Sequence, residues 1–261
     1  MKIFDSHCHL TDKSYREDFD DVLRRMADAE VAAAMTVGIT RSDSEATVAL
    51  AESRDNLIAS VGIHPHDARH AAEADMDRLR ELATRPGVHA WGETGLDFNR
   101  MFSPREDQEH WLRRQLDIAD DLDLPLIFHE RDSEGRFLEI LRERYPDGRK
   151  GVVHCFSGTR EEMFAYLELG LHIGITGILT VKGRGADLRE MAPEIPADRI
   201  LVETDAPYLT PVPERNKHRR NEPAFVRTTL LRLAEVREED PETLAETVWN
   251  NTCRLFDYPS A

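Results

Sequence analysis

The sequence predicts an α/β fold of the (β/α)8 TIM-barrel class. Short apolar runs alternate with amphipathic helical stretches, as expected of repeated βαβ units around a parallel sheet. Several of these runs end in histidine or an acidic residue, and the carboxyl ends of barrel strands converge on one face. The chain has 261 residues, which is close to the usual length of one barrel, so we expect a single domain over 1–261.

Eight apolar runs are the predicted strands. They lie at 3–8, 34–39, 58–63, 88–93, 125–129, 151–155, 172–176 and 200–204. Apolar residues at helical spacing predict a helix over 18–30 and another over 106–123, after which Pro125 opens a strand. Two further helices are predicted within 222–256. No linker or low-complexity tract divides the chain.

The composition restricts the kinds of partner. The chain has 34 basic and 50 acidic residues and a net charge of −16, which argues against tight, sequence-independent binding of long duplex DNA. A nuclease that holds a few nucleotides in a pocket is still compatible with this charge. No apolar stretch approaches the roughly 20 residues of a membrane span. The N-terminus has no signal-peptide core, so we expect a cytoplasmic protein.

Four histidines are candidate metal ligands. His7 and His9 close the first strand and point to the same face, because alternate residues of a strand share a face. His129 and His154 follow strands five and six at the same relative position. A lone histidine is more often a buried core residue, but this recurrence favours metal ligation. Cys8 and Cys155, beside two of these histidines, are expected to be buried structural thiols.

Two acidic residues complete the predicted centre. Glu93 ends strand four between Gly92 and Gly95, which let the backbone approach a crowded site closely. A buried carboxylate needs a partner, and a bridge between two metal ions supplies it. Asp205 ends strand eight, where it can contact both a metal ion and the attacking water, so we predict that it is the general base. Glu203 shares that face one layer deeper and suits a structural role.

The number of ligands predicts two divalent ions. The first would be held by His7, His9, Glu93 and Asp205, and the second by Glu93, His129 and His154. Two ions about 3.5–4 Å apart clamp the attacking and leaving oxygens of a phosphoryl transfer. Imidazole-rich ligation favours Zn²⁺ or Mn²⁺ over Mg²⁺, which prefers oxygen. These residues indicate a metal-dependent hydrolase.

Four other residues are candidates for substrate binding. His64 and His66 follow strand three, and we expect one of them, with His64 as the candidate, to face the pocket as a substrate-binding group or as the support of a ligand. Arg131, like Arg100 and Arg105, either holds a phosphate oxygen or pairs with an acid. Lys217 and Arg219 belong to a basic run after strand eight, where barrel loops commonly bind phosphate. The alternative is that Arg219 and Arg220 pair with acids such as Glu214 and Glu222 and fix the loop that holds Asp205.

Six motifs spread over the chain resemble one known family. They are Asp5–Leu10, Val61–His66, Gly92–Phe98, His154–Gly158, Glu203–Leu209 and Arg219–Pro223. On these residues the chain resembles the TatD family of metal-dependent deoxyribonucleases, within the amidohydrolase-like barrels. The segment Phe98–Glu106 is similar to the family's namesake enzyme, whereas the intact pair of His7 and His9 is similar to its paralogues.

The resemblance implies an activity and a cofactor. Members are divalent-metal-dependent, often Mg²⁺-dependent, 3′→5′ exonucleases on single-stranded DNA or RNA, linked to DNA repair. Some relatives deacylate mischarged D-aminoacyl-tRNA. The physiological ion stays open between Mg²⁺, Mn²⁺ and Zn²⁺, because the ligand chemistry and the family's preference differ. We expect a monomer that acts on the ends of single-stranded DNA or RNA.

Two other functions stay open from the sequence alone. One is a metal-dependent hydrolase of carbon esters or amides, such as a D-aminoacyl-tRNA deacylase or a lactonase. No lysine lies on strand four, which disfavours the subclasses whose metals are bridged by a modified lysine. The other is a non-enzymatic metal-binding scaffold. The complete ligand set argues against it, since a scaffold has no use for an open metal position.

Overall fold

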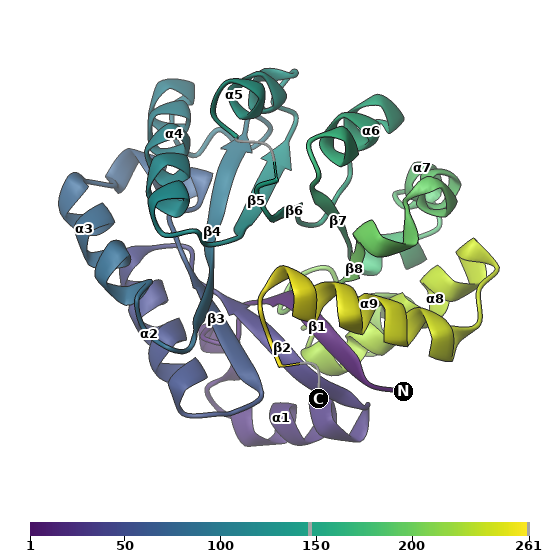
Figure 1. Ribbon diagram of the computed structural model, residues 1–261. Coiled ribbons are helices and arrows are strands. Elements are labelled where there is room, and N and C mark those ends of the chain that lie inside the picture. The colour runs from purple at the N-terminus through teal and green to yellow at the C-terminus, as the bar shows by residue number, and fades with distance from the viewer. Residues whose placement is uncertain (146–147, 260–261) are drawn as a thin grey trace. The chain divides into compact units, whose positions relative to one another are not determined.

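The computed structural model describes residues 1–145 and 148–259, and all eight predicted strands are present. They are β1 (Ile3–Cys8), β2 (Val31–Val37), β3 (Leu57–Val61), β4 (Val88–Asp97), β5 (Leu126–Arg131), β6 (Gly151–Val153), β7 (His172–Ile175) and β8 (Ile200–Val202). Their order in the sheet follows the sequence. A helix lies in the chain between every two successive strands (Figure 1). This is the predicted (β/α)8 arrangement.

The helices agree with the sequence pattern. They are α1 (Phe19–Asp28), α2 (Arg41–Glu52), α3 (Glu73–Leu82), α4 (Arg105–Asp121), α5 (Arg136–Arg144), α6 (Arg160–Glu168), α7 (Ala186–Met191), α8 (Val226–Arg237) and α9 (Pro241–Leu255). The two helices predicted near the C-terminal end are therefore confirmed as α8 and α9. Within the described part of the chain, none of the helices is long and apolar enough to cross a membrane.

Only β1 has the predicted bounds, and two strands, β2 and β4, differ from their predictions by more than two residues at one end. β2 begins at Val31 rather than at residue 34, because its alanines have little β-propensity and gave no strand signal. β4 continues past Glu93 to Asp97, since Thr94–Asp97 pairs in parallel with Phe128–Arg131 of β5. This extension puts Asp97 on the same strand, and on the same face, as Glu93.

The chain forms two compact units, and unit 1 consists of Met1–Thr36 and Ile173–Ala261. In this unit β1 pairs with β2 and β7 pairs with β8, all in parallel. A bridge between Cys8 and Ala206 joins the end of β1 to the segment after β8. Helix α9 packs against β1 and β8, and the rings of Phe4 and Trp249 lie 5.6 Å apart in this core. Unit 1 is thus built from both ends of the chain.

Unit 2 is the continuous segment Val37–His172, which contains the parallel strands β3 to β6. Figure 1 shows α2, α3 and α4 flanking β3 and β4, and α2 and α4 pack against these strands. Gln115 of α4 is buried and links this helix by hydrogen bonds to β4 and to the segment after β3. Its amide donates to the oxygens of Ile63 and Thr94, and its carbonyl accepts from the Trp91 indole at 3.1 Å.

A glycine permits the close approach of β4 and β5. Gly95 has a φ of +152°, and a Cβ atom placed there would lie 1.8 Å from the carbonyl oxygen of His129. Any larger residue would push the two strands apart. Because β5 carries His129 and β4 carries Glu93, this contact sets the spacing of two predicted ligands.

Candidate metal centre

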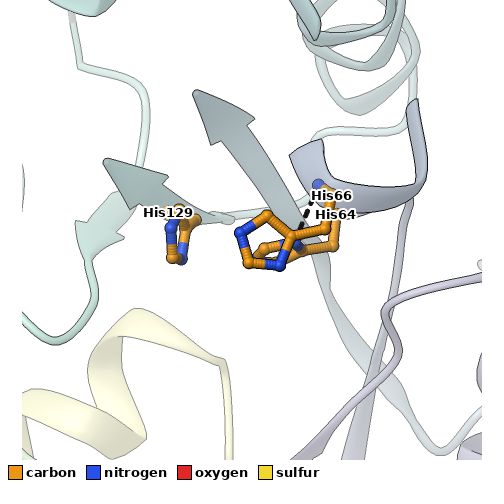
Figure 2. Close-up of side chains that lie close together, drawn as sticks. All are labelled: His64, His66 and His129. Atoms are coloured by element: carbon orange, nitrogen blue, oxygen red, sulfur yellow. Dashed lines mark hydrogen bonds between the residues drawn. The ribbon is translucent and has the colours of Figure 1, made fainter. Parts of the chain in front are cut away.

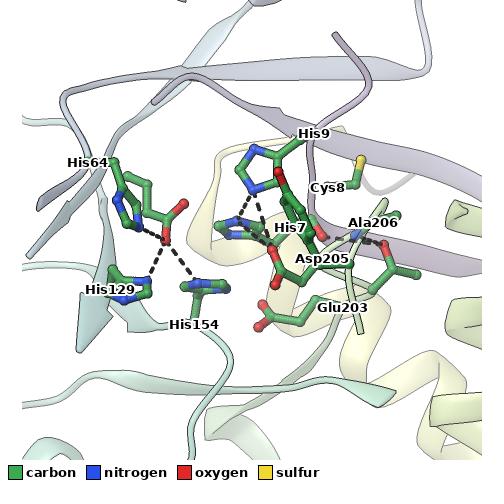
Figure 3. Close-up of polar contacts among 12 residues, drawn as sticks. His7, Cys8, His9, His64, His129, His154, Glu203, Asp205 and Ala206 are labelled. Carbon is green, nitrogen blue, oxygen red and sulfur yellow. Dashed lines mark hydrogen bonds and ion pairs between the residues drawn. The ribbon is translucent and has the colours of Figure 1, made fainter. Parts of the chain in front are cut away.

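Glu93 lies among three imidazoles in unit 2. Its Oε1 atom is 2.9 Å from His129 Nδ1, 3.0 Å from His154 Nε2 and 3.3 Å from His64 Nε2 (Figure 3). Neighbouring parallel strands produce this arrangement, because Glu93 lies on β4, His129 on β5 and His154 directly after β6. Ligand atoms of Glu93, His129 and His154 lie within 4.8 Å of one another. A carboxylate with two imidazoles is a donor set that fits a divalent cation.

His64 is a hydrogen-bond donor in this group. Its Nδ1 atom accepts the backbone N–H of His66 at 3.0 Å (Figure 2), so a neutral ring carries its proton on Nε2. Burial lowers the pKa of His64 to about 4, against the opposing charge of Glu93. The ring is therefore neutral near neutral pH and presents Nε2–H to Glu93, a geometry that suits donation to an anionic oxygen better than metal ligation.

A second carboxylate, Asp97, lies in this group and was not predicted from the sequence. Its Oδ2 atom lies 2.7 Å from His66 Nε2 and 3.3 Å from His129 Nε2. Burial would raise the pKa of Asp97, but the bonds to His129 and His66 lower it well below its usual range. Burial alone would lower the pKa of His129, but Asp97 and Glu93 raise it overall. Carboxylates commonly orient ligand histidines in this way.

The signal for Asp97 was present but ambiguous. Residues 93, 95 and 97 share one face of a strand, whereas the glycine-rich motif suggested that the strand had ended. Asp97 also closes the following loop, because it accepts the backbone N–H of Arg100 at 2.7 Å. Asp97 therefore both contacts His129 and closes the loop. It also contacts His66, which belongs to the site through this contact.

A second group of ligand atoms converges in unit 1. His7 Nε2 and His9 Nε2 are 3.3 Å apart, and Asp205 Oδ1 lies 3.7 Å and 3.4 Å from them (Figure 3). The backbone fixes this geometry, because Asp205 N–H donates to the His7 carbonyl at 2.9 Å and His9 N–H donates to the Ala206 carbonyl at 2.7 Å. Two imidazoles and a carboxylate again form a set that fits a divalent cation.

Buried polar residues support this second group. Asp5 accepts the backbone N–H and the hydroxyl of Thr204 at 2.8 and 2.6 Å. Burial raises the pKa of Asp5 to about 8, although these bonds oppose the shift. Glu203 is fully buried and accepts the Ser6 hydroxyl at 3.3 Å, which fits its predicted structural role. Cys8 is buried as predicted, whereas Cys155 is only partly buried, contrary to the expectation.

The predicted phosphate-binding cations are accessible. Arg131 is partly exposed, and Lys217 and Arg219 are exposed. Within residues 1–145 and 148–259, no carboxylate lies within ion-pair distance of these three side chains. Arg105, by contrast, pairs with Glu134 at 3.0 Å.

The alternative pairing proposed for the basic run is wrong for Arg219 and only partly right for Arg220. The Arg220 guanidinium pairs with Asp18 at 2.6 Å and approaches Glu222 only to 4.0 Å. Glu222 is instead paired with Arg25 at 2.7 Å. Short-range reading of the sequence could not find Asp18, which is about two hundred positions away along the chain.

Comparison with known proteins now identifies the family. The model of the TatD related DNase family matches residues 4–257 of the chain. The chain belongs to the TatD related DNase family. It is 43% identical over 257 residues to a protein of Rahnella sp. (strain Y9602) described as 3′-5′ ssDNA/RNA exonuclease TatD, with 97% of this chain and 98% of the relative covered. A protein of Escherichia coli (strain K12) with the same description is 42% identical, with the same coverage.

Solved structures of the TatD family confirm the fold class. The crystal structure of YJJV, a TatD homolog from E. coli K12, matches with a TM-score of 0.91 and 30% identity, covering 98% of both chains. A TatD family hydrolase from Entamoeba histolytica matches with a TM-score of 0.89 and 26% identity, covering 99% of both chains. The predicted class, a metal-dependent hydrolase of the nuclease type with a TIM-barrel fold, is therefore confirmed.

Proposed function

We propose that this protein is a 3′→5′ exonuclease that hydrolyses phosphodiester bonds at the ends of single-stranded DNA or RNA with divalent metal ions. Its family membership and the relatives described as single-stranded DNA and RNA exonucleases support this proposal. The observation that carries it is the convergence of Glu93 with His129 and His154 at 2.9 and 3.0 Å. The ester hydrolase reading, such as a D-aminoacyl-tRNA deacylase, is not favoured by these relatives.

We propose six residues as metal ligands for two ions. They are His7, His9, Glu93, His129, His154 and Asp205, as expected from the sequence. When bound, two such ions activate water and neutralise the charge of the phosphate group that is attacked. The imidazole content favours Zn²⁺ or Mn²⁺, whereas the resemblance to the family implies Mg²⁺, so all three belong in a test.

The remaining roles follow from what each side chain can donate or accept. Asp205 is proposed as the general base, which takes a proton from the attacking water through a carboxylate oxygen. His64, neutral and protonated on Nε2, is proposed to donate to a phosphate oxygen of the substrate in place of Glu93 Oε1, which lies 3.3 Å from Nε2. Arg131, Lys217 and Arg219 are proposed to bind phosphates, because each is accessible and has no carboxylate partner among the residues that the structure describes.

The setting of this activity is also a proposal. We propose that 1–261 acts as one domain, as a monomer and in the cytoplasm, as expected from the sequence. The match of one family model to residues 4–257 supports the single-domain reading.

The activity can be tested on the purified full-length chain. Single-stranded DNA, single-stranded RNA, duplex DNA and D-aminoacyl-tRNA are incubated with Mg²⁺, Mn²⁺ or Zn²⁺ after removal of metal by a chelator. We expect 5′-labelled single strands to shorten progressively from the 3′ end, and duplex DNA to be degraded more slowly. Deacylation of the aminoacyl-tRNA without any loss of nucleotides would contradict the proposed function.

A further inference from the structure

A cleft of about 520 Å³ opens in unit 1 beside the segment that follows β8. Its wall includes the apolar side chains of Ile178, Pro207 and Leu209. Tyr208 also lines it and is 55% exposed, unusual for so large a ring. The ring centroid of Tyr208 lies 6.0 Å from that of His9, so the cleft begins next to a proposed metal ligand.

The backbone around Tyr208 is held at several points. Its N–H donates to the Asp205 carbonyl at 2.8 Å, and its carbonyl accepts the Asn221 amide at 2.6 Å. Asn221 is itself buried and donates its backbone N–H to Pro207 at 3.0 Å. On the other side, Gly177 packs so closely that a Cβ atom would lie 2.7 Å from the Leu209 carbonyl oxygen. The exposed ring therefore stands on a fixed support and not on a loose loop.

The same cleft is lined by three arginines without acidic partners. Arg184, Arg215 and Arg219 line it and are exposed. Throughout 1–145 and 148–259, no carboxylate lies within ion-pair distance of these side chains. Arg25 and Arg220 nearby are both paired with Asp18. In a protein of net charge −16, an unpaired group of cations marks a surface that attracts anions.

We propose that this cleft binds an unpaired nucleoside next to the hydrolysed phosphate, with its base stacked on Tyr208 and the three arginines facing the flanking phosphates. This inference rests on the proposed function, whose substrate it specifies. Proteins that hold single strands combine an aromatic stacking surface with a positively charged groove. A base within a duplex is already stacked and paired, so the cleft selects a single-stranded end.

The first test measures binding without turnover. The metal-loaded protein is titrated with a labelled single-stranded oligonucleotide whose 3′ linkages resist hydrolysis, and the dissociation constant is read from fluorescence anisotropy. Tyr208→Ala is expected to weaken binding roughly ten-fold, within the usual range for one stacked base, while Tyr208→Phe restores it. Phe164→Ala, which removes another exposed ring outside the cleft, is the matched control. Equal affinity of Tyr208→Ala and the unmodified protein would overturn the proposal.

A second measurement assigns the loss to stacking. An oligonucleotide lacking the base of its last or next-to-last nucleotide is expected to bind the unmodified protein as weakly as Tyr208→Ala binds the intact strand. The variant is expected to lose nothing more with the substrate that lacks the stacked base. If removing the ring and removing the base weakened binding independently, the ring would contribute to binding by something other than stacking.

A third measurement tests the arginines. The double variant Arg184→Gln/Arg215→Gln is expected to flatten the dependence of log K on log salt by about 0.7 for each lost phosphate contact.

The outcomes separate this inference from the proposed activity. If hydrolysable single strands are degraded but Tyr208→Ala changes neither the dissociation constant nor KM, the exonuclease proposal stands and the cleft proposal falls. If Tyr208→Ala weakens binding but no strand is degraded with any metal, the cleft binds nucleic acid and the activity has been misassigned. If the unmodified protein does not bind single strands at all, both proposals fail.

Discussion

Asp205, the proposed general base, is held in a fixed position beside two proposed metal ligands. Its carboxylate lies within 3.7 Å of two imidazole nitrogens, and its backbone adopts a positive φ of 56°, where the N–H bond to His7 holds it. Asp205→Asn keeps the size of the side chain but cannot take a proton. We expect kcat for single-stranded DNA to fall by roughly 10²–10⁴, with little change in KM, in steady-state assays. A rise in KM at constant kcat would make Asp205 a binding residue instead.

Asp97 contacts His129, one of the proposed metal ligands. Because its Oδ2 atom lies 3.3 Å from His129 Nε2, it orients the ring whose Nδ1 atom approaches Glu93. We expect Asp97→Asn to weaken metal affinity by about 10–100-fold, measured by titration of the metal-free protein. Asp77→Asn, the same substitution at an exposed position of α3, is the control. An unchanged affinity would show that Asp97 serves only to close the loop at Arg100.

The residues that sequence reasoning found and missed differ in one physical respect. His7, Glu93 and His129 each lie at or near the end of an apolar run in the sequence, a purely local pattern. Asp97 and His66 enter the site only through the pairing of β4 with β5 and through the turn after β3, which no local pattern encodes. Tyr208 was visible as part of a family motif, but its exposure beside a cleft depends on tertiary packing.

Strand β4 shows that the end of a strand can also escape prediction from a local sequence pattern. Glycine usually weakens a strand, so Gly92 and Gly95 made the sequence appear to leave the sheet at Glu93. In the structure these glycines allow β4 and β5 to approach, and Gly95 pairs in register with His129. The apolar runs and helical spacings located all eight strands, whereas the strand ends depended on contacts with neighbouring strands.

Gly95 gives a direct test of this close approach. A Cβ atom there would lie 1.8 Å from the His129 carbonyl oxygen at a backbone φ of +152°. We expect Gly95→Ala to lower the free energy of unfolding by about 1–3 kcal/mol, measured by urea denaturation. Gly183→Ala, where no atom lies within 4 Å of the added group, is the control and should change stability by under about 0.5 kcal/mol. If the two substitutions changed the free energy of unfolding equally, β5 would move aside without loss of stability.

The loop after β8 is anchored by the ion pair of Arg220 with Asp18. Hydrogen bonds from Arg220, and next from Arg25, lower the pKa of Asp18 from 3.8 to about 2, although burial opposes the shift. A lowered carboxyl pKa stabilises the folded state above the unfolded pKa, and this contribution disappears as the pH falls towards 2. Asp18 is about one-third exposed, so the contribution is under about 1 kcal/mol.

Arg220→Gln tests that anchor through its pH dependence. We expect the variant to be less stable than the unmodified protein near neutral pH, with the difference shrinking towards about pH 2.5 as Asp18 becomes protonated in both. Urea midpoints at the two pH values measure it. A difference that does not depend on pH would indicate lost packing of Arg220 on the Tyr15 ring, 4.7 Å away, and not a lost ion pair.

At the scale of the whole molecule, metal binding and folding should be linked. Ligands that bind only the folded state raise its stability by RT ln(1 + [L]/Kd), about 2.7 kcal/mol at a hundred times Kd. We expect a chelator to abolish exonuclease activity and to lower Tm by several degrees, about 2–4 °C per kcal/mol for a chain of this size. Addition of Mn²⁺, Mg²⁺ or Zn²⁺ should restore both the activity, measured in exonuclease assays, and Tm, measured in thermal scans. Activity that persists after exhaustive chelation would contradict a metal-dependent mechanism.

The discontinuous composition of unit 1 has a consequence for the order of folding. Its first segment, which carries His7 and His9, is synthesised well before its partners in β8 and α9. The continuous unit 2 is complete before then and can form its own strand pairs. The loop that must close to join β1 with β8 spans most of the chain, and long-range closures of this kind slow folding. The nascent N-terminal strand can therefore pair with β2 early, but its other edge stays unpaired until the segment after β8 has been made.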